Sequence, residues 1–245
     1  MERIAILVDG GFYQRQAQSL WGSVSAAKRA DELVSYCDRH LKWHHERDEL
    51  YRIFYYDCHP SDKKVFHPLL KKQVDLAKTS LYLWKTDFLK EIISKRKVAL
   101  RLGRLSDIGL NYTLTSDAVK RLCDGRLDVS SLSEENFTLN IMQKGVDTRI
   151  GMDIASLAYK RQVTRIVLIS ADSDFVPLVK LARREGIDVI LDPMWHDVNK
   201  DLLEHVDGLR SPGSHPSAKN NVSVSRQQGK RTTQESTKED AKPIC

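Results

Sequence analysis

Four aspartates follow apolar runs in a pattern that could bind a metal ion. Asp9 ends ILVD, Asp147 ends KGVD after the run FTLNIMQ, and Asp172 and Asp174 lie in LISADSD. One aspartate after a strand is explained by helix capping, because its carboxylate accepts backbone N–H bonds of the next helix. A second acid at the same place needs another explanation. Three strand ends with this feature favour one shared site.

The chemistry of such a site follows from its charge. If the strands are adjacent and parallel, their carboxyl ends bring the carboxylates together, where each raises the pKa of the others unless a cation neutralises them. Ligand sets made only of oxygen suit Mg²⁺ or Mn²⁺, which keep several waters and contact substrate phosphates. Such ions can generate a hydroxide and stabilise the leaving oxygen of a phosphodiester. The pattern thus predicts a Mg²⁺ or Mn²⁺ site, and the alternative that each aspartate only caps its own helix stays open.

The elements that must position these residues alternate between two patterns. Short apolar runs predict strands over residues 3–8, 50–57, 97–105, 137–143, 165–170 and 187–192. Apolar residues at helical spacing predict helices over residues 26–44, 115–123, from 147 onward, 175–184 and 200–205, and a further helix over 63–78 that is broken or bent near Pro68. This alternation predicts an α/β fold with a parallel sheet and helices on both faces. Ligand sites in such sheets lie beyond the carboxyl ends of the strands.

Composition narrows the class of protein. The net charge of +6 and the pI near 9.1 favour an anionic partner, such as nucleic acid. The four cysteines show no CxxC spacing, which argues against a zinc ribbon or a disulfide scaffold and fits a reducing compartment. The first apolar run is too short for a signal peptide, and no stretch approaches the roughly 18 apolar residues of a membrane span. We therefore expect a soluble, cytoplasmic protein with no membrane partner.

Four segments resemble a known family: ILVDGGFY, FYYD, KGVDTRIGMDIASLAY and VLISADSDFVPLVKLARREGIDVIL. They are similar to the NYN domain of the LabA-like group within the PIN-like nuclease superfamily. The resemblance runs from Ile4 to about Leu209, and its most specific part is residues 144–191. It implies a PIN-like parallel sheet, metal-ligand and catalytic roles for Asp9, Asp147 and Asp172, and a fourth acid at Asp174. Gly11, Phe12 and Tyr13 depart from the family, in which many members carry an asparagine after the first Asp-Gly.

The function implied by the resemblance is that of a metal-dependent ribonuclease, which leaves a 5′-phosphate and a 3′-hydroxyl. The alternative is a PIN-like module that binds RNA or a protein partner without measurable catalysis. A phosphatase of the haloacid dehalogenase type is disfavoured, because it needs a second acid where Gly11 stands. The sequence leaves open the natural RNA, whether DNA is also cut, and whether cleavage is endo or exo. It also leaves open self-association, regulation by a partner, and whether Asp153 joins the site.

The domain prediction is one NYN domain over residues 1–210, with a basic insertion around 59–136, followed by a disordered polar tail over 211–245. Within the insertion, five basic residues are predicted to contact the RNA backbone: Lys95, Arg96, Lys97, Arg101 and Arg104. The alternative is a solvated surface. His40 and His44 have i,i+4 spacing, for which solvated helix residues are favoured over a zinc site. The glycines form no phosphate-binding loop, so no nucleotide cofactor is expected.

Overall fold

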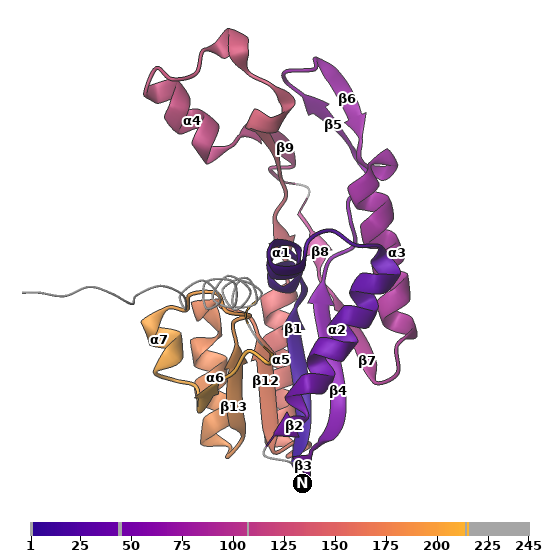
Figure 1. Ribbon diagram of the computed structural model, residues 1–245, viewed down its shortest axis with the longest axis vertical. Helices are drawn as coiled ribbons and strands as arrows, with labels where there is room; N and C mark the ends of the chain where they lie inside the picture. Colours follow the sequence, from indigo (N-terminus) through magenta and orange to yellow (C-terminus); the bar gives the residue numbers. More distant parts are fainter. Residues whose placement is uncertain (1, 44–45, 107, 214, 216–245) are drawn as a thin grey trace, which may run out of the picture. The chain divides into compact units, whose positions relative to one another are not determined.

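The computed structural model describes residues 2–43, 46–106, 108–213 and 215. Its main sheet has six strands in the order β14-β13-β12-β1-β4-β7, and every neighbouring pair is parallel. The strands are β1 (Arg3–Asp9), β4 (Glu49–Asp57), β7 (Val98–Leu102), β12 (Arg165–Ile169), β13 (Asp188–Asp192) and β14 (Gly208–Leu209). All six carboxyl ends therefore lie at one edge of the sheet (Figure 1).

The central strand β1 is apolar on both faces, as expected of a strand covered on both sides. Its residues from Ile4 to Val8 are fully buried. On one side Val8 is in register with Ile169 of β12, and on the other with Tyr55 of β4. Burying one such side chain contributes roughly 1.5–3 kcal/mol.

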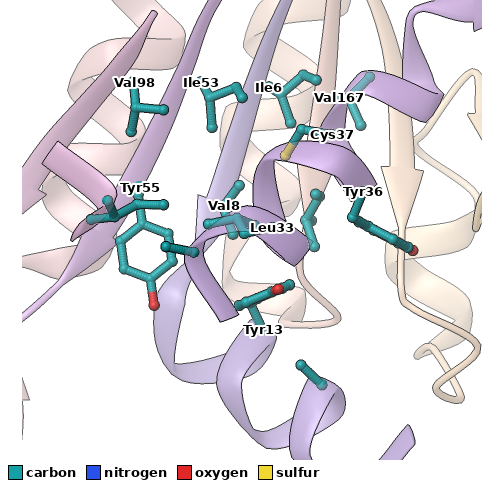
Figure 2. Close-up of a cluster of buried hydrophobic side chains, with 14 of the residues drawn as sticks. Ile6, Val8, Tyr13, Leu33, Tyr36, Cys37, Ile53, Tyr55, Val98 and Val167 are labelled. Atoms are coloured by element: carbon teal, nitrogen blue, oxygen red, sulfur yellow. The ribbon is translucent and has the colours of Figure 1, made fainter. Parts of the chain in front are cut away.

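Helices cover both faces, because successive side chains of a strand point in opposite directions. Ile6 and Val8 pack with α1 (Gly10–Trp21), α2 (Ala26–His40) and α3 (Ser80–Ser94), and Figure 2 shows part of this cluster. Ala5 and Leu7 pack on the other side with α5 (Val146–Tyr159), α6 (Val176–Arg184) and α7 (Lys200–Leu203). The predicted α/β fold with a parallel sheet between two helical layers is confirmed.

Smaller elements lie between β4 and α5, beyond the carboxyl ends of the main strands (Figure 1). Three antiparallel pairs occur there: β5 (Lys64–His67) with β6 (Lys72–Asp75), β9 (Asn111–Leu114) with β10 (Phe137–Asn140), and β8 (Arg104–Leu105) with β11 (Gln143–Lys144). The helices of this region, besides α3, are η1 (Leu76–Lys78), α4 (Ser116–Cys123), η2 (Val129–Ser131) and η3 (Glu134–Asn136). The short pair β2 (Lys42–Trp43) and β3 (Glu46–Arg47) precedes β4.

Two predictions of secondary structure are wrong. The helix expected over 63–78 is the β5–β6 hairpin followed by η1, since Pro68 lacks an N–H and Lys71 adopts the left-handed region at φ 50°. The strand expected over 137–143 is divided between β10 and β11, and neither joins the main sheet. Asp147 therefore does not follow a strand of the parallel sheet. The structure also contains two helices, α1 and α3, that were not predicted from the sequence.

Residues Met1–Pro212 form one compact unit. The tail predicted to be disordered lies outside the described residues from 216 onward, as do His44 and His45. Within the described part of the chain, no helix has the length and apolar character needed to cross a bilayer.

Candidate active site

Asp9 ends β1 and caps α1. Its Oδ1 accepts a hydrogen bond from the Phe12 N–H at 3.1 Å. The following residue, Gly10, brings the helix against β4: a Cβ at Gly10 would lie 2.5 Å from the Tyr56 carbonyl oxygen and 2.6 Å from Tyr55 Cζ. Only glycine allows the chain to turn into a helix this close to the neighbouring strand.

Asp147 reaches the same edge of the sheet from a helix rather than a strand. It lies in the first turn of α5, where a carboxylate is favoured by the helix dipole. The helix begins after Gly145, whose φ of 77° lies in the left-handed region that favours glycine. Asp147 is exposed, and it is not the N-cap residue of α5, a position that Gly145 occupies.

Asp172 and Asp174 follow β12. Asp172 caps η4 (Ser173–Phe175), with its Oδ1 accepting from the Asp174 N–H at 2.9 Å. Its own N–H donates to the hydroxyl of the buried Ser170 at 3.3 Å, which holds the turn. Capping thus accounts for one oxygen of Asp172, while Asp174 is exposed and presents its carboxylate to solvent.

The four carboxylates interact electrostatically. Burial raises the pKa of Asp9 above 3.8; the Phe12 N–H and Arg15 oppose this increase, and the charge of Asp147 adds to it. The pKa of Asp147 is raised first by loss of water around its carboxylate and then by the charges of Asp172 and Asp174. The structure therefore brings the four predicted acids into one chain of mutually repelling charges.

The chemistry of these donors fits a hard divalent cation. They supply only oxygen, and a bound cation would relieve the repulsion that raises the pKa values of Asp9 and Asp147. Among the described residues, no group of three or more His, Cys, Asp or Glu side chains lies close enough together to hold a metal ion. Mg²⁺ is commonly bound through one or two carboxylates plus waters. Such a site needs no more carboxylates than two neighbours in this group would supply.

Two further acids end strands of the main sheet, and both are fully buried. Asp57 of β4 accepts from Lys85 Nζ at 2.7 Å and from the Tyr55 hydroxyl at 3.2 Å. Asp192 of β13 lies 2.8 Å from His40 Nε2 and accepts from the Ser211 hydroxyl at 2.7 Å. Their positions in FYYD and VILD could have suggested them from the sequence. His40 is thus buried in a hydrogen-bonded pair, rather than solvated as expected.

Asp153 is held away from this group. Its Oδ2 accepts from the Tyr56 hydroxyl and from Arg101 Nε, each at 2.9 Å. The spacing of six residues from Asp147 separates their faces of α5, and the two aspartates have different partners.

The basic residues predicted to contact RNA do not gather at one place. Lys95, Arg96 and Lys97 precede β7 and therefore lie toward the edge of the sheet opposite to Asp9. Lys95 Nζ is 2.6 Å from Asp31 Oδ1, and Lys97 Nζ donates to the Leu50 carbonyl.

The remaining two basic residues differ from each other. Arg101 is engaged with Asp153 and lies over the ring of Phe54. Arg104, in β8, is exposed on the carboxyl side of the sheet. Arg15, which the sequence reading did not select, lies beside Asp9: a Cβ at Gly11 would be 3.6 Å from Arg15 Nη1 and 3.5 Å from Asp9 Oδ1.

Comparison with known proteins gives one family. Residues 110–208 match the NYN domain, a range that includes Asp147, Asp172 and Asp174 but not Asp9. No curated protein matches the chain.

The solved structures give weaker likenesses. A protein of unknown function from Vibrio parahaemolyticus is 15% identical, with 85% of this chain and 91% of that chain covered and a TM-score of 0.42. A Sir2 structure with a p53 peptide and NAD⁺ is 11% identical, covers 93% of each chain and has a TM-score of 0.33. Both likenesses are too low to support an argument about function.

Proposed function

We propose that the chain is a metal-dependent ribonuclease that hydrolyses RNA phosphodiester bonds at the carboxyl edge of its sheet, because residues 110–208 match the NYN domain. The observation that carries this proposal is the contrast between two sets of acids at that edge. Asp57 and Asp192 are neutralised or fully hydrogen-bonded inside the protein. Within the described residues, Asp9, Asp147, Asp172 and Asp174 make no ion pair, so their charge is available to a ligand.

Placing several unpaired carboxylates near one another destabilises the folded protein unless a bound cation offsets their repulsion. Nearby carboxylates destabilise each other's ionised forms, and perturbed pKa values of this kind cluster at functional sites. The exposed acids Asp147, Asp172 and Asp174 stand at the solvent side, while the half-buried Asp9 is fixed by its bond to Phe12. This combination of one rigid and several accessible carboxylates suits a site that takes a cation together with a phosphate.

Each residue then has a role that its position supports. Asp9 and Asp147 would hold Mg²⁺ or Mn²⁺, with Asp172 and Asp174 contributing negative charge and hydrogen bonds to bound water. A bound ion of this type supplies an activated water and stabilises the leaving oxygen of the phosphodiester. The guanidinium of Arg15, beside Asp9, is placed to contact a phosphate oxygen of the strand.

The alternative function is a module that binds RNA or a protein partner with little or no catalysis. It is favoured by the lack of a set of three ligating side chains among the described residues. The two functions differ in one measurable outcome, which is metal-dependent turnover.

The deciding experiment incubates the purified chain with labelled single-stranded and structured RNAs in Mn²⁺, Mg²⁺ or EDTA. We expect cleavage with either ion and none with EDTA. Asp87→Asn, at an exposed acid of α3, is the matched control for Asp9→Asn and should leave cleavage unchanged. RNA binding without cleavage in any metal would establish the alternative.

A further inference from the structure

A pocket of about 440 Å³ adjoins the candidate active site. Its wall is formed by the start of α1, the start of α3 and the segments between β4 and α5. Gly11 and Arg15 lie on the side of Asp9, and Tyr82 and Tyr112 line the pocket from α3 and β9. The residues that build it therefore come largely from the region that the sequence analysis treated as an insertion.

We propose that this pocket binds one unpaired nucleobase of the RNA strand whose phosphate lies at Asp9. The choice of RNA rests on the proposed function. The pocket itself would take the flat, partly apolar ring of a base, and would thereby select single-stranded RNA over a fully paired duplex.

The lining suits a base in its chemistry. Most of the pocket wall is apolar, with side chains such as Leu76, Leu105 and Leu139 beside the two tyrosines. Bases stack on aromatic side chains, and single-stranded RNA exposes bases for this purpose. The volume lies in the range of roughly 300–1,000 Å³ found for small-ligand pockets.

The charge distribution argues for a nucleotide rather than an uncharged apolar ligand. Two cations, Arg15 and Lys85, line the pocket. Lys85 is bonded to Asp57, so its charge is already balanced. Arg15 is exposed and has no carboxylate in ion-pair distance among the described residues, which leaves its guanidinium for the phosphate attached to a bound base.

The pocket and the acids are contiguous at Gly11. This residue lines the pocket, and a Cβ built on it would lie 3.5 Å from Asp9 Oδ1 and 4.0 Å from Gln143 Nε2. Gly11 is therefore in contact with both the pocket and the Asp9 carboxylate. A base in the pocket would therefore have its own phosphate near Asp9, within the span of one nucleotide.

The test uses single-stranded RNA that carries 2-aminopurine at one position, bound to the full chain in EDTA so that cleavage does not occur. We expect its fluorescence to fall on binding to the parent protein and to change much less with Tyr82→Ala or Tyr112→Ala. The affinity should weaken about tenfold, as expected for loss of one stacked base. Tyr159→Ala, at an exposed tyrosine of α5, is the matched control and should behave as the parent.

A second RNA with one abasic position separates stacking from loss of fold. For the parent protein, the abasic RNA should bind about tenfold more weakly than the complete RNA. For the Tyr82→Ala variant, the two RNAs should bind with equal affinity. If the abasic position weakened the affinity equally for the parent and the variant, the proposal that the pocket binds a base would be overturned. The readout does not depend on turnover, so loss of fluorescence in EDTA together with no RNA cleavage in Mn²⁺ or Mg²⁺ would refute the ribonuclease and retain the pocket.

Discussion

The ammonium of Lys85 lies 2.7 Å from Oδ1 of Asp57, inside the carboxyl edge of the sheet. The Asp57 side chain is fully buried and that of Lys85 is 14% exposed. This pair neutralises the acid at the end of β4, whereas Asp9, at the end of the adjacent strand β1, has no such partner among the described residues. Neighbouring strands thus end in acids with different roles.

We predict that Lys85→Met lowers the free energy of unfolding by about 3–5 kcal/mol, because it leaves the Asp57 carboxylate buried without its cation. Urea denaturation measures the loss. Adding Asp57→Asn should recover a large part of it, since the amide is uncharged, its oxygen keeps the bond from the Cys58 N–H, and its NH2 group can donate to the Tyr55 hydroxyl. A double variant as unstable as the single one would contradict this account of the pair.

Asp9→Asn and Asp147→Asn should each abolish metal-dependent cleavage and strongly weaken Mn²⁺ binding. Asparagine also caps helices well, so the bond to Phe12 is kept and the fold survives. Isothermal calorimetry with Mn²⁺ and RNA cleavage assays check the two effects. Unchanged Mn²⁺ affinity in both variants would rule out a shared site.

The raised pKa of Asp9 predicts a pH dependence of stability in the metal-free protein. Burial makes the folded state bind this proton more tightly than the unfolded state, so stability falls as pH rises from about 4 through the folded pKa. Asp9→Asn removes the group and should be more stable than the parent near neutral pH. Denaturation midpoints in EDTA from about pH 4 to about pH 8 measure this difference, which should shrink toward acid pH.

Gly10→Ala should destabilise the protein by at least about 1–3 kcal/mol, because the added methyl group meets the backbone oxygen of Tyr56. Gly11→Ala is the matched control: its Cβ has no neighbour closer than 3.5 Å, and alanine is the better helix former. The melting temperature should fall clearly with Gly10→Ala, and should rise or change much less with Gly11→Ala. Similar losses of stability in both variants would show that the start of α1, rather than contact with β4, requires glycine at position 10.

The basic residues divide into two groups with different expected effects on RNA binding. Replacing Arg15 and Arg104, on the side of the acids, should reduce the salt slope of affinity by roughly 0.7 for each lost phosphate contact. Replacing Arg96 and Lys97, toward the opposite edge, should leave the slope close to that of the parent. Filter binding across salt concentrations distinguishes the two. Equal slopes in both variants would favour the original prediction that the segment from Lys95 to Arg104 contacts RNA as a whole.

Much of the sheet could be predicted because its strands are buried on both faces and read as apolar runs. Helix α1 was missed because it starts with two glycines, the poorest helix formers after proline, and owes its stability to packing on β1 and β4. The β5–β6 hairpin was taken for a helix because short, mixed segments have no clear period. Local sequence does not contain the tertiary contacts that decide either case.

The structure places the four acids within electrostatic reach of one another, although Asp147 gets there by a route that the sequence did not predict. Asp147 was expected at the end of a sheet strand, and it arrives instead through the first turn of α5. Which strand-end acids carry free charge could not be predicted, because Lys85 and His40 reach Asp57 and Asp192 from positions distant in the chain. Sequence order does not reveal these pairings.

The place of β1 in the middle of the sheet has a consequence during synthesis. One edge of β1 pairs with β4, which follows within the first 57 residues, but the other pairs with β12, and Arg3 bonds to Thr164, which is 161 positions away. While the chain is being made, the backbone N–H and C=O groups on this side of β1 stay without their partner strand until β12 (Arg165–Ile169) has left the ribosome. The proposed site also stays incomplete during this time, because Asp147 and Asp172 are synthesised long after Asp9. The proposed nuclease would therefore remain inert beside ribosomal RNA until the chain has been made at least as far as Asp174.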